Sequence, residues 1–257
     1  MRRSISPAGR NALALAICLT AATGFAQKKD DAPRITAIAP LEIAPGVATT
    51  LKIRGLKLDD AKEVRFLGFP EQKAELKEKK KAEVPNGTEA KTVGDTQAEV
   101  IVTLPADTPV GRMEIVLITG AGETEPREII AADAASFLDE KEENNGFDQA
   151  QAIELGKTVR GQVKQDRDVD VYAFTLTSGG TVVVEAIAAR ASSLHDPLLT
   201  IFDEKRRIIT MADDSETRDP VITLKAPAPG KYFIVVQDAN DRGGAWHNYH
   251  LTVKEAP

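Results

Sequence analysis

Seven acidic and amide side chains in the second half of the sequence could together bind a metal ion. They stand in two groups about twenty residues apart, and within each group the oxygen-bearing side chains recur at nearly every second position. Calcium takes six to eight oxygen ligands, and carboxylates and amides that alternate along an extended segment can supply several of them from one side. The sequence therefore predicts a calcium site, with candidate ligands Glu140, Glu142, Asn144, Asn145, Asp166, Asp168 and Asp170. The alternative is that the first group is an acidic, solvated linker and that Asp170 is a turn residue before a strand.

Residue types used in catalysis are present, but they lack the spacing that catalysis needs. His247 and His250 form only a His-x-x-His pair, without the His-Glu-x-x-His helix of metalloproteases. Ser193 is close in sequence to His195 and Asp196, yet no Gly-x-Ser-x-Gly turn surrounds it. We therefore predict a protein that is not an enzyme and has no catalytic residues.

Two further motifs could bind a ligand through exposed side chains. Trp246 could be an aromatic platform for a peptide or a glycan, although a lone tryptophan before a last strand more often covers the edge of a core. The run Lys79, Lys80 and Lys81 could bind an anion, but glutamates are interleaved with the lysines of this segment.

The first 26 residues have the layout of a secretory signal peptide. Basic residues precede an apolar run from 12 to 22, which is followed by Gly24, Phe25 and Ala26. This run is too short to cross a membrane, which takes about 20 apolar residues. We expect cleavage near Ala26 and a secreted or periplasmic protein without a membrane span; lipidation of Cys18 is the competing interpretation.

The charge and cysteine content of the cleaved chain exclude several classes of function. Cleavage leaves 30 basic against 39 acidic residues, a net charge of −9, which opposes nonspecific binding to nucleic acid. Cys18 is the only cysteine and leaves with the signal peptide, so no thiol remains for a disulfide, a metal or a nucleophile. Stability must then come from hydrophobic cores, to which bound ions could add.

The elements that must position these residues are short strands. Runs rich in Val, Ile, Thr and Phe alternate with Gly, Pro, Asn and Asp, which predicts an all-β fold of two β-sandwich domains. In the second half, Tyr172, Phe174 and Leu176 share one face by the period of two, as do Tyr249, Leu251 and Val253, and we expect both sets in the core. The predicted strands are 34–39, 49–54, 63–69, 98–104 and 113–119, and then 158–163, 171–176, 181–187, 198–202, 221–224, 232–236 and 249–253.

A charged segment interrupts the first set of strands. Residues 71–83 hold five lysines and four glutamates and almost no apolar side chain. We expect a solvated helix or loop in which Glu75 and Lys79 pair one turn apart. The predicted domains are 33–131, with a charged insertion at 71–97, and 144–254, joined by an acidic linker at 132–143.

The second half resembles the bacterial pre-peptidase C-terminal domain, or PPC domain. The resemblance covers about residues 138–254 and implies a β-sandwich that is appended to secreted proteases and other exported proteins and has no catalytic residues of its own. It rests on these landmarks in order: Glu142-Glu143-Asn144-Asn145, Gly161, Asp168-Val169-Asp170-Val171-Tyr172-Ala173-Phe174, His195-Asp196-Pro197-Leu198-Leu199, Ala212-Asp213-Asp214, Asp219-Pro220 and Pro229-Gly230-Lys231-Tyr232.

The first half is similar to the IPT/TIG family of immunoglobulin-like domains. The similar residues are Ile35-Thr36-Ala37-Ile38-Ala39-Pro40, then Pro45-Gly46, then Leu51-Lys52-Ile53-Arg54-Gly55-Leu56. The charged segment at 71–97 departs from a minimal domain of that family.

A further resemblance bears on the metal. The collagen-binding domains of clostridial collagenases, which resemble the second half, bind calcium through a Glu-x-Glu-x-Asn segment followed by Asn or Asp, and through aspartates of a neighbouring loop. Glu140, Glu142, Asn144 and Asn145 match that segment.

These observations together predict an exported, non-catalytic binding or accessory protein, stabilised by Ca²⁺, that engages an extracellular or envelope protein, glycan or matrix partner. The alternative is an accessory or remnant module of a secreted peptidase that assists its folding or targeting. Neither interpretation includes nucleic acid as a partner.

Overall fold

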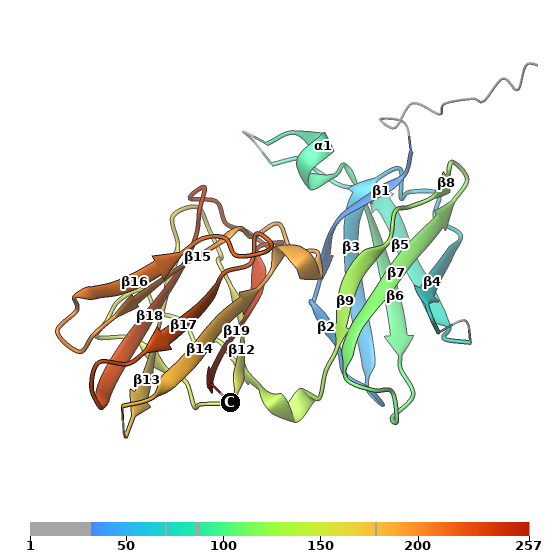
Figure 1. The fold of residues 1–257 in the computed structure, drawn as a ribbon. Helices are drawn as coiled ribbons and strands as arrows, with labels where there is room; N and C mark the ends of the chain where they lie inside the picture. The colour runs from blue at the N-terminus through green and yellow to red at the C-terminus, as the bar shows by residue number, and fades with distance from the viewer. Residues whose placement is uncertain (1–31, 70, 86–87, 178, 257) are drawn as a thin grey trace, which may run out of the picture. The chain divides into compact units, whose positions relative to one another are not determined.

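The computed structural model describes residues 32–69, 71–85, 88–177 and 179–256. Nearly all of its regular structure is β-strand, which confirms the predicted all-β class (Figure 1). The predicted signal peptide and Cys18 lie outside the described residues. No helix among the described residues is long and apolar enough to cross a membrane.

The first half forms two sheets around one core. The first sheet has the order β1 (Arg34–Ala39), β3 (Ala48–Leu56), β6 (Thr96–Thr103), β5 (Ala74–Lys81). The second has the order β2 (Glu42–Ile43), β9 (Arg127–Ala131), β7 (Gly111–Thr119), β4 (Glu63–Leu67), with β8 (Gly122–Glu123) also on β7. All of these pairs are antiparallel except β2 with β9. A short helix, α1 (Ala90–Val93), precedes β6.

The second half forms two further sheets of five strands each. One has the order β10 (Phe137–Asp139), β12 (Thr158–Gln162), β19 (Asn248–Glu255), β14 (Thr181–Ile187), β17 (Val221–Lys225). The other has the order β11 (Gln151–Ala152), β13 (Val169–Leu176), β18 (Gly230–Asp238), β15 (Pro197–Phe202), β16 (Ile208–Ala212). Two 3₁₀ turns, η2 (Ala134–Ser136) and η3 (Ala189–Ala191), precede β10 and β15.

The alternation of side chains along the strands builds these cores. Tyr172, Phe174 and Leu176 of β13 are all buried in the core of the second sandwich, as predicted from their period of two. The opposite face of β13 is buried as well, because Val171 and Ala173 pack in a smaller cluster with Phe233. Since both of its faces are buried, β13 is a rigid support for any polar side chain that it carries inward.

Residues 74–81 of the charged segment form a strand, so the prediction of a solvated helix or loop is wrong there. β5 pairs with β6 at the edge of its sheet and keeps most of its side chains exposed. Glu75 pairs with Lys77, at 2.6 Å and two positions away along the same side of the strand, instead of with Lys79. A charged edge strand blocks pairing with other chains, and composition alone did not separate it from a solvated helix.

The middle of the predicted linker belongs to a sheet. Phe137–Asp139 is strand β10 and pairs in parallel with β12, and Leu138 packs against the second core. The second sheet system therefore begins before residue 144. Residues 32–257 form one unit by their contacts, so the domain boundaries remain predictions.

Candidate metal centre

Three of the predicted ligands converge where the chain enters the second sandwich. One carboxylate oxygen each of Glu140, Glu142 and Asp170 lies within 4.8 Å of the others. Glu140 follows strand β10, Glu142 stands two residues further on, and Asp170 is in β13. The cluster therefore joins an extended segment to a central strand of the sheet that follows it.

Two tyrosines of the core donate hydrogen bonds to this cluster. Tyr249 in β19 donates a hydrogen bond of 2.6 Å to Oδ2 of Asp170, and Tyr172 in β13 donates one of 2.6 Å to Oε1 of Glu140. The two hydroxyl oxygens are 2.7 Å apart. Gly161 in β12 makes room for them, because a Cβ there would lie 2.2 Å from the Tyr249 ring. The sequence predicts both tyrosines only as core residues and does not predict their role at the carboxylates.

Asp170 is fully buried, and its environment disfavours its negative charge. Burial and, after it, the negative charge of Glu140 raise the pKa of Asp170 to about 8. The hydrogen bond from Tyr249 acts in the opposite direction and only partly offsets these effects. Asp170 therefore holds a proton at neutral pH unless a bound cation displaces that proton.

Two buried oxygens of the cluster have no hydrogen-bond donor among the described residues. They are Oδ1 of Asp170 and Oδ1 of Asn144, a side chain that is 0% exposed. The Asn144 amide is oriented by its Nδ2, which donates to Oε1 of Glu140 at 3.3 Å. Buried polar atoms are almost always paired, and oxygens in this state fit a cation.

The remaining predicted ligands lie outside the three-carboxylate group. Asp168 is buried, but its Oδ2 accepts a 2.7 Å hydrogen bond from the backbone N–H of Lys164. Asp166 is exposed and accepts from the backbone N–H of Gly243 at 3.1 Å. Asn145 is exposed. The structure thus groups three of the seven candidates and places a fourth, Asn144, beside them.

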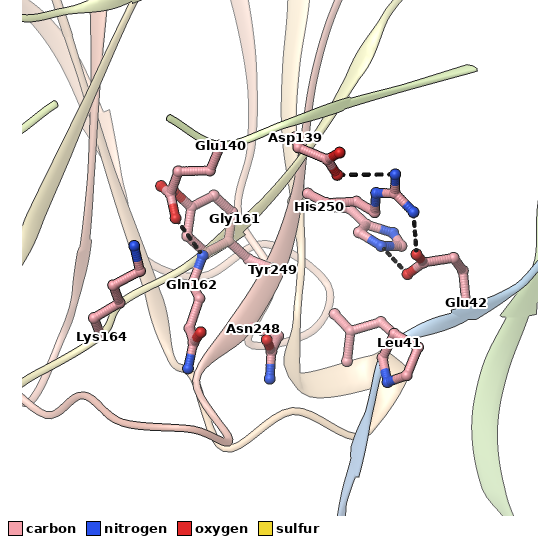
Figure 2. Close-up of a pocket in the computed structure, with 12 residues that line it drawn as sticks. Leu41, Glu42, Asp139, Glu140, Gly161, Gln162, Lys164, Asn248, Tyr249 and His250 are labelled. Atoms are coloured by element: carbon pink, nitrogen blue, oxygen red, sulfur yellow. Dashed lines mark hydrogen bonds and ion pairs between the residues drawn. The ribbon is translucent and has the colours of Figure 1, made fainter. Parts of the chain in front are cut away.

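A second polar network lies next to the cluster, in a cavity of about 240 Å³ that Glu140 also lines (Figure 2). Glu42 of β2 is buried there and lies 3.1 Å from Arg160 and 2.8 Å from Nε2 of His250. Arg160 also pairs with Asp139 at 2.8 Å. Burial raises the pKa of Glu42, but His250 and Arg160 together outweigh burial, so the pKa lies below its usual value. The sequence does not predict this network, because Glu42 and His250 are 208 positions apart.

The histidine and serine residues form no catalytic arrangement among the described residues. The Ser193 hydroxyl donates to the Trp246 carbonyl at 3.0 Å and accepts from the His195 backbone N–H. His195 faces Asp238 through Nδ1 at 3.2 Å. Burial raises the pKa of Asp238, but the His195 contact and three backbone N–H donors lower it to about 2. This carboxylate therefore organises the loop after β18.

Comparison with known proteins agrees with the fold of the second half. Residues 168–238 match the family model of the bacterial pre-peptidase C-terminal domain, which confirms the resemblance seen in the sequence. The match runs from the end of the segment before β13 to the end of β18, within the second sandwich. The resemblance of the first half to IPT/TIG domains stays a prediction.

One curated relative and two solved structures are similar over parts of the chain. A probable subtilase-type serine protease of Deinococcus radiodurans is 30% identical over 141 residues, which are 52% of this chain and 19% of the protease. The pre-peptidase C-terminal domain of a Bacillus anthracis collagenase is 20% identical and covers 41% of this chain and 94% of that domain, with a TM-score of 0.35. The SGBP-B protein of a Bacteroides ovatus mixed-linkage glucan utilization locus, in complex with a mixed-linkage heptasaccharide, is 10% identical and covers 80% of this chain and 74% of that one, with a TM-score of 0.29. The chain spans about a fifth of the protease, and neither TM-score reaches 0.5.

Proposed function

We propose that this chain is an exported, non-catalytic accessory protein whose second sandwich is stabilised by a calcium ion at Glu140, Glu142 and Asp170. The observation that carries the proposal is the convergence of these three carboxylates within 4.8 Å, one of them fully buried. Without a bound cation, burial and the charge of Glu140 keep Asp170 protonated, and Glu142 pairs with Lys164 at 3.0 Å. A bound cation would allow all three carboxylates to be ionised together.

The type and number of donors fit calcium better than a transition metal. Carboxylate and amide oxygens are hard ligands, and neither a thiolate nor an imidazole belongs to the group. The unpaired Oδ1 atoms of Asn144 and Asp170 add candidate donors from the protein. Solvent oxygens commonly complete a calcium shell of six to eight ligands.

Calcium would add a cross-link between the segment after β10 and strand β13. Glu140 and Glu142 belong to that segment, and Asp170 belongs to a strand that is buried on both faces. Bound calcium would remove the repulsion among the three carboxylates and would favour the ionised form of Asp170, because metal ligands must be deprotonated. The chain's own part is to hold Asp170 and Glu140 in place through Tyr249 and Tyr172.

Calcium titration with thermal unfolding tests this site. For the chain without residues 1–26, calcium at about 100 times its Kd stabilises the native state by about 2.7 kcal/mol. That corresponds to a rise in Tm of roughly 5–10 °C for a chain of this size. We expect the rise to vanish in the Glu142→Ala, Asn144→Ala double variant and to persist in a Glu63→Ala control, where an exposed glutamate of β4 is removed. A rise of equal size in both variants would contradict the proposed site.

A role beside a secreted peptidase is the second candidate. It is supported by the match over 141 residues to a probable subtilase-type protease, and by the PPC domain in the second sandwich. Both also support export, since the domain is named for its place in peptidase precursors. Binding of a secreted peptidase from the same organism to the purified chain, measured by calorimetry, would favour this candidate. Binding to an envelope polymer instead would favour the broader binding role.

A further inference from the structure

A second cavity, of about 710 Å³, has more basic than acidic side chains in its lining, and the calcium proposal does not use it. Residues of both sandwiches line it. Six of the lining side chains are arginine or lysine and four are aspartate or glutamate, whereas the chain as a whole has a net charge of −6. A local excess of positive charge in an acidic protein marks a place for an anion.

Arg127 in β9 is the centre of this positive charge. Its Nε is buried without an acceptor, and among the described residues its guanidinium has no carboxylate partner, only the carbonyl of Thr36 at 3.2 Å. Burial lowers the pKa of Arg127, and the positive charges of Arg218 and Arg34 lower it further. Three guanidinium groups therefore repel one another around one cavity, and an oxyanion would relieve this repulsion.

Three of the four acidic side chains of the cavity, those of Asp166, Asp196 and Asp238, accept hydrogen bonds from neighbouring loop residues. Asp238 accepts backbone N–H groups from three residues and faces His195. Asp166 accepts from Gly243, and Asp196 accepts from the Asn240 side chain and stands 3.9 Å from Arg218. Most of the negative charge in the lining thus organises the loops and leaves Arg127 uncompensated.

The remaining lining of the cavity favours a sugar with an anionic group as the ligand. Trp246 is half-buried in the lining and offers an indole surface next to the basic groups. An aromatic side chain with one wet face packs well against the apolar face of a pyranose ring. The volume lies within the range of about 300–1,000 Å³ that small-ligand sites occupy.

We propose that this cavity binds an acidic saccharide, with Arg127, Arg34 and Arg218 receiving its carboxylate or sulfate group and Trp246 contacting the sugar ring. The proposal goes beyond the calcium-stabilised accessory role proposed above and does not depend on calcium. Arginine suits this task because its planar fork pairs with two oxygens of a carboxylate or sulfate at once.

Calorimetric titrations of the chain without residues 1–26, in a calcium-free buffer of low ionic strength, test the proposal. The probes are trigalacturonate, a sulfated chondroitin disaccharide, maltotriose and a triaspartate peptide. We expect binding of trigalacturonate if the site takes a carboxylate, or of the chondroitin disaccharide if it takes a sulfate, and none of neutral maltotriose. Failure of both acidic sugars to bind, or binding of triaspartate as tightly as the better sugar, would overturn the proposal.

Variants locate the binding within the cavity. Loss of a charged hydrogen-bond partner should weaken binding about 10- to 100-fold in Arg127→Gln. Arg65→Gln is the matched control, because Arg65 is an exposed arginine of β4 outside the cavity and is paired with Glu63. Arg218→Gln, at an exposed position, replaces Arg127→Gln if that variant does not fold. Equal affinity in the wild type and the cavity variant would overturn the proposal.

The calcium response of the same samples separates this proposal from the proposed function. A normal calcium-induced rise in Tm without saccharide binding means that the saccharide proposal alone fails. Saccharide binding without any calcium response means that the calcium site fails and the basic cavity stands.

Discussion

The hydroxyl of Tyr249 donates a 2.6 Å hydrogen bond to Oδ2 of Asp170, and both side chains are fully buried. This bond favours the ionised form of a carboxylate that burial and Glu140 would otherwise keep protonated. The other carboxylate oxygen of Asp170, Oδ1, has no hydrogen-bond partner among the described residues. Asp170 is thus held between two states, protonated when alone and ionised when a cation is bound.

Replacement of Asp170 by asparagine should separate stability from calcium binding. Asparagine keeps an acceptor for Tyr249 and removes a buried carboxyl group beside Glu140 that is about half ionised at pH 8. We expect Asp170→Asn to raise the free energy of unfolding of the calcium-free protein at pH 8 by about 1–3 kcal/mol and to abolish its calcium response. Denaturant unfolding with and without calcium measures both effects. A variant that is less stable than the wild type without calcium would contradict the unfavourable charge assigned to Asp170.

Removal of the Tyr249 hydroxyl should weaken calcium binding at neutral pH. In Tyr249→Phe, Oδ2 of Asp170 loses its donor, so the pKa of Asp170 rises further and ionisation costs more. We expect the calcium Kd at pH 7 to increase about tenfold and the difference from the wild type to shrink at higher pH. Tyr232→Phe is the control, because that hydroxyl bonds the Ala228 carbonyl away from the cluster. Equal losses in the two variants would indicate a general packing effect.

The Glu42 network should stabilise the fold at neutral pH and fail in acid. The pKa of Glu42 is lower in the folded state than in the unfolded chain, so its contribution is present above about pH 4.5 and is lost as the pH falls through the lowered value. We expect Glu42→Gln to cost about 1–3 kcal/mol at pH 7 and less at pH 3. Glu63→Gln, which breaks an exposed pair, should cost at most about 0.5 kcal/mol. A cost for Glu42→Gln that does not change with pH would refute the linkage.

His247 should make the protein sensitive to mild acid. Burial lowers the pKa of His247 to about 4, so the folded state keeps it neutral while the unfolded chain takes up a proton below about pH 6.5. The contribution of His247 to stability therefore falls as the pH drops from about 6.5 to 4. We expect the free energy of unfolding, measured in urea, to fall less over this pH range in His247→Gln than in the wild type. Parallel pH profiles would show that His247 is not the responsible group.

The sequence predicts the strands with regular alternation well and predicts contacts between distant residues poorly. β1 and β14 have the predicted bounds, and β14 alternates between buried and half-buried side chains, as a strand with one face on the core does. β5 was missed because a charged edge strand has no apolar face to detect. β9 and β16 were missed as well, since each has only a short run of apolar residues.

The sequence predicts only part of the candidate site, because local hydrogen bonds decide which carboxylates can bind a metal. Glu140, Glu142 and Asp170 follow a recognisable pattern of oxygen ligands, and the structure brings them together. Asp168 also has a carboxylate, but its Oδ2 accepts a hydrogen bond from the backbone N–H of Lys164, four residues away. Which carboxylates stay available depends on local hydrogen bonds that spacing does not reveal. The role of Tyr172 and Tyr249 at the carboxylates was not predicted, because a core aromatic and a ligand-orienting aromatic have the same sequence pattern.

The most direct test of the calcium site is proton release during calcium binding. Asp170 carries a proton at neutral pH in the calcium-free protein and must lose it to bind the metal. Calorimetric titration at pH 7 in two buffers of different ionisation enthalpy counts the protons released. The account predicts that nearly one proton is released for each calcium bound at pH 7 and almost none at pH 9.5. Calcium binding without proton release at pH 7, or no binding at millimolar calcium, would contradict it.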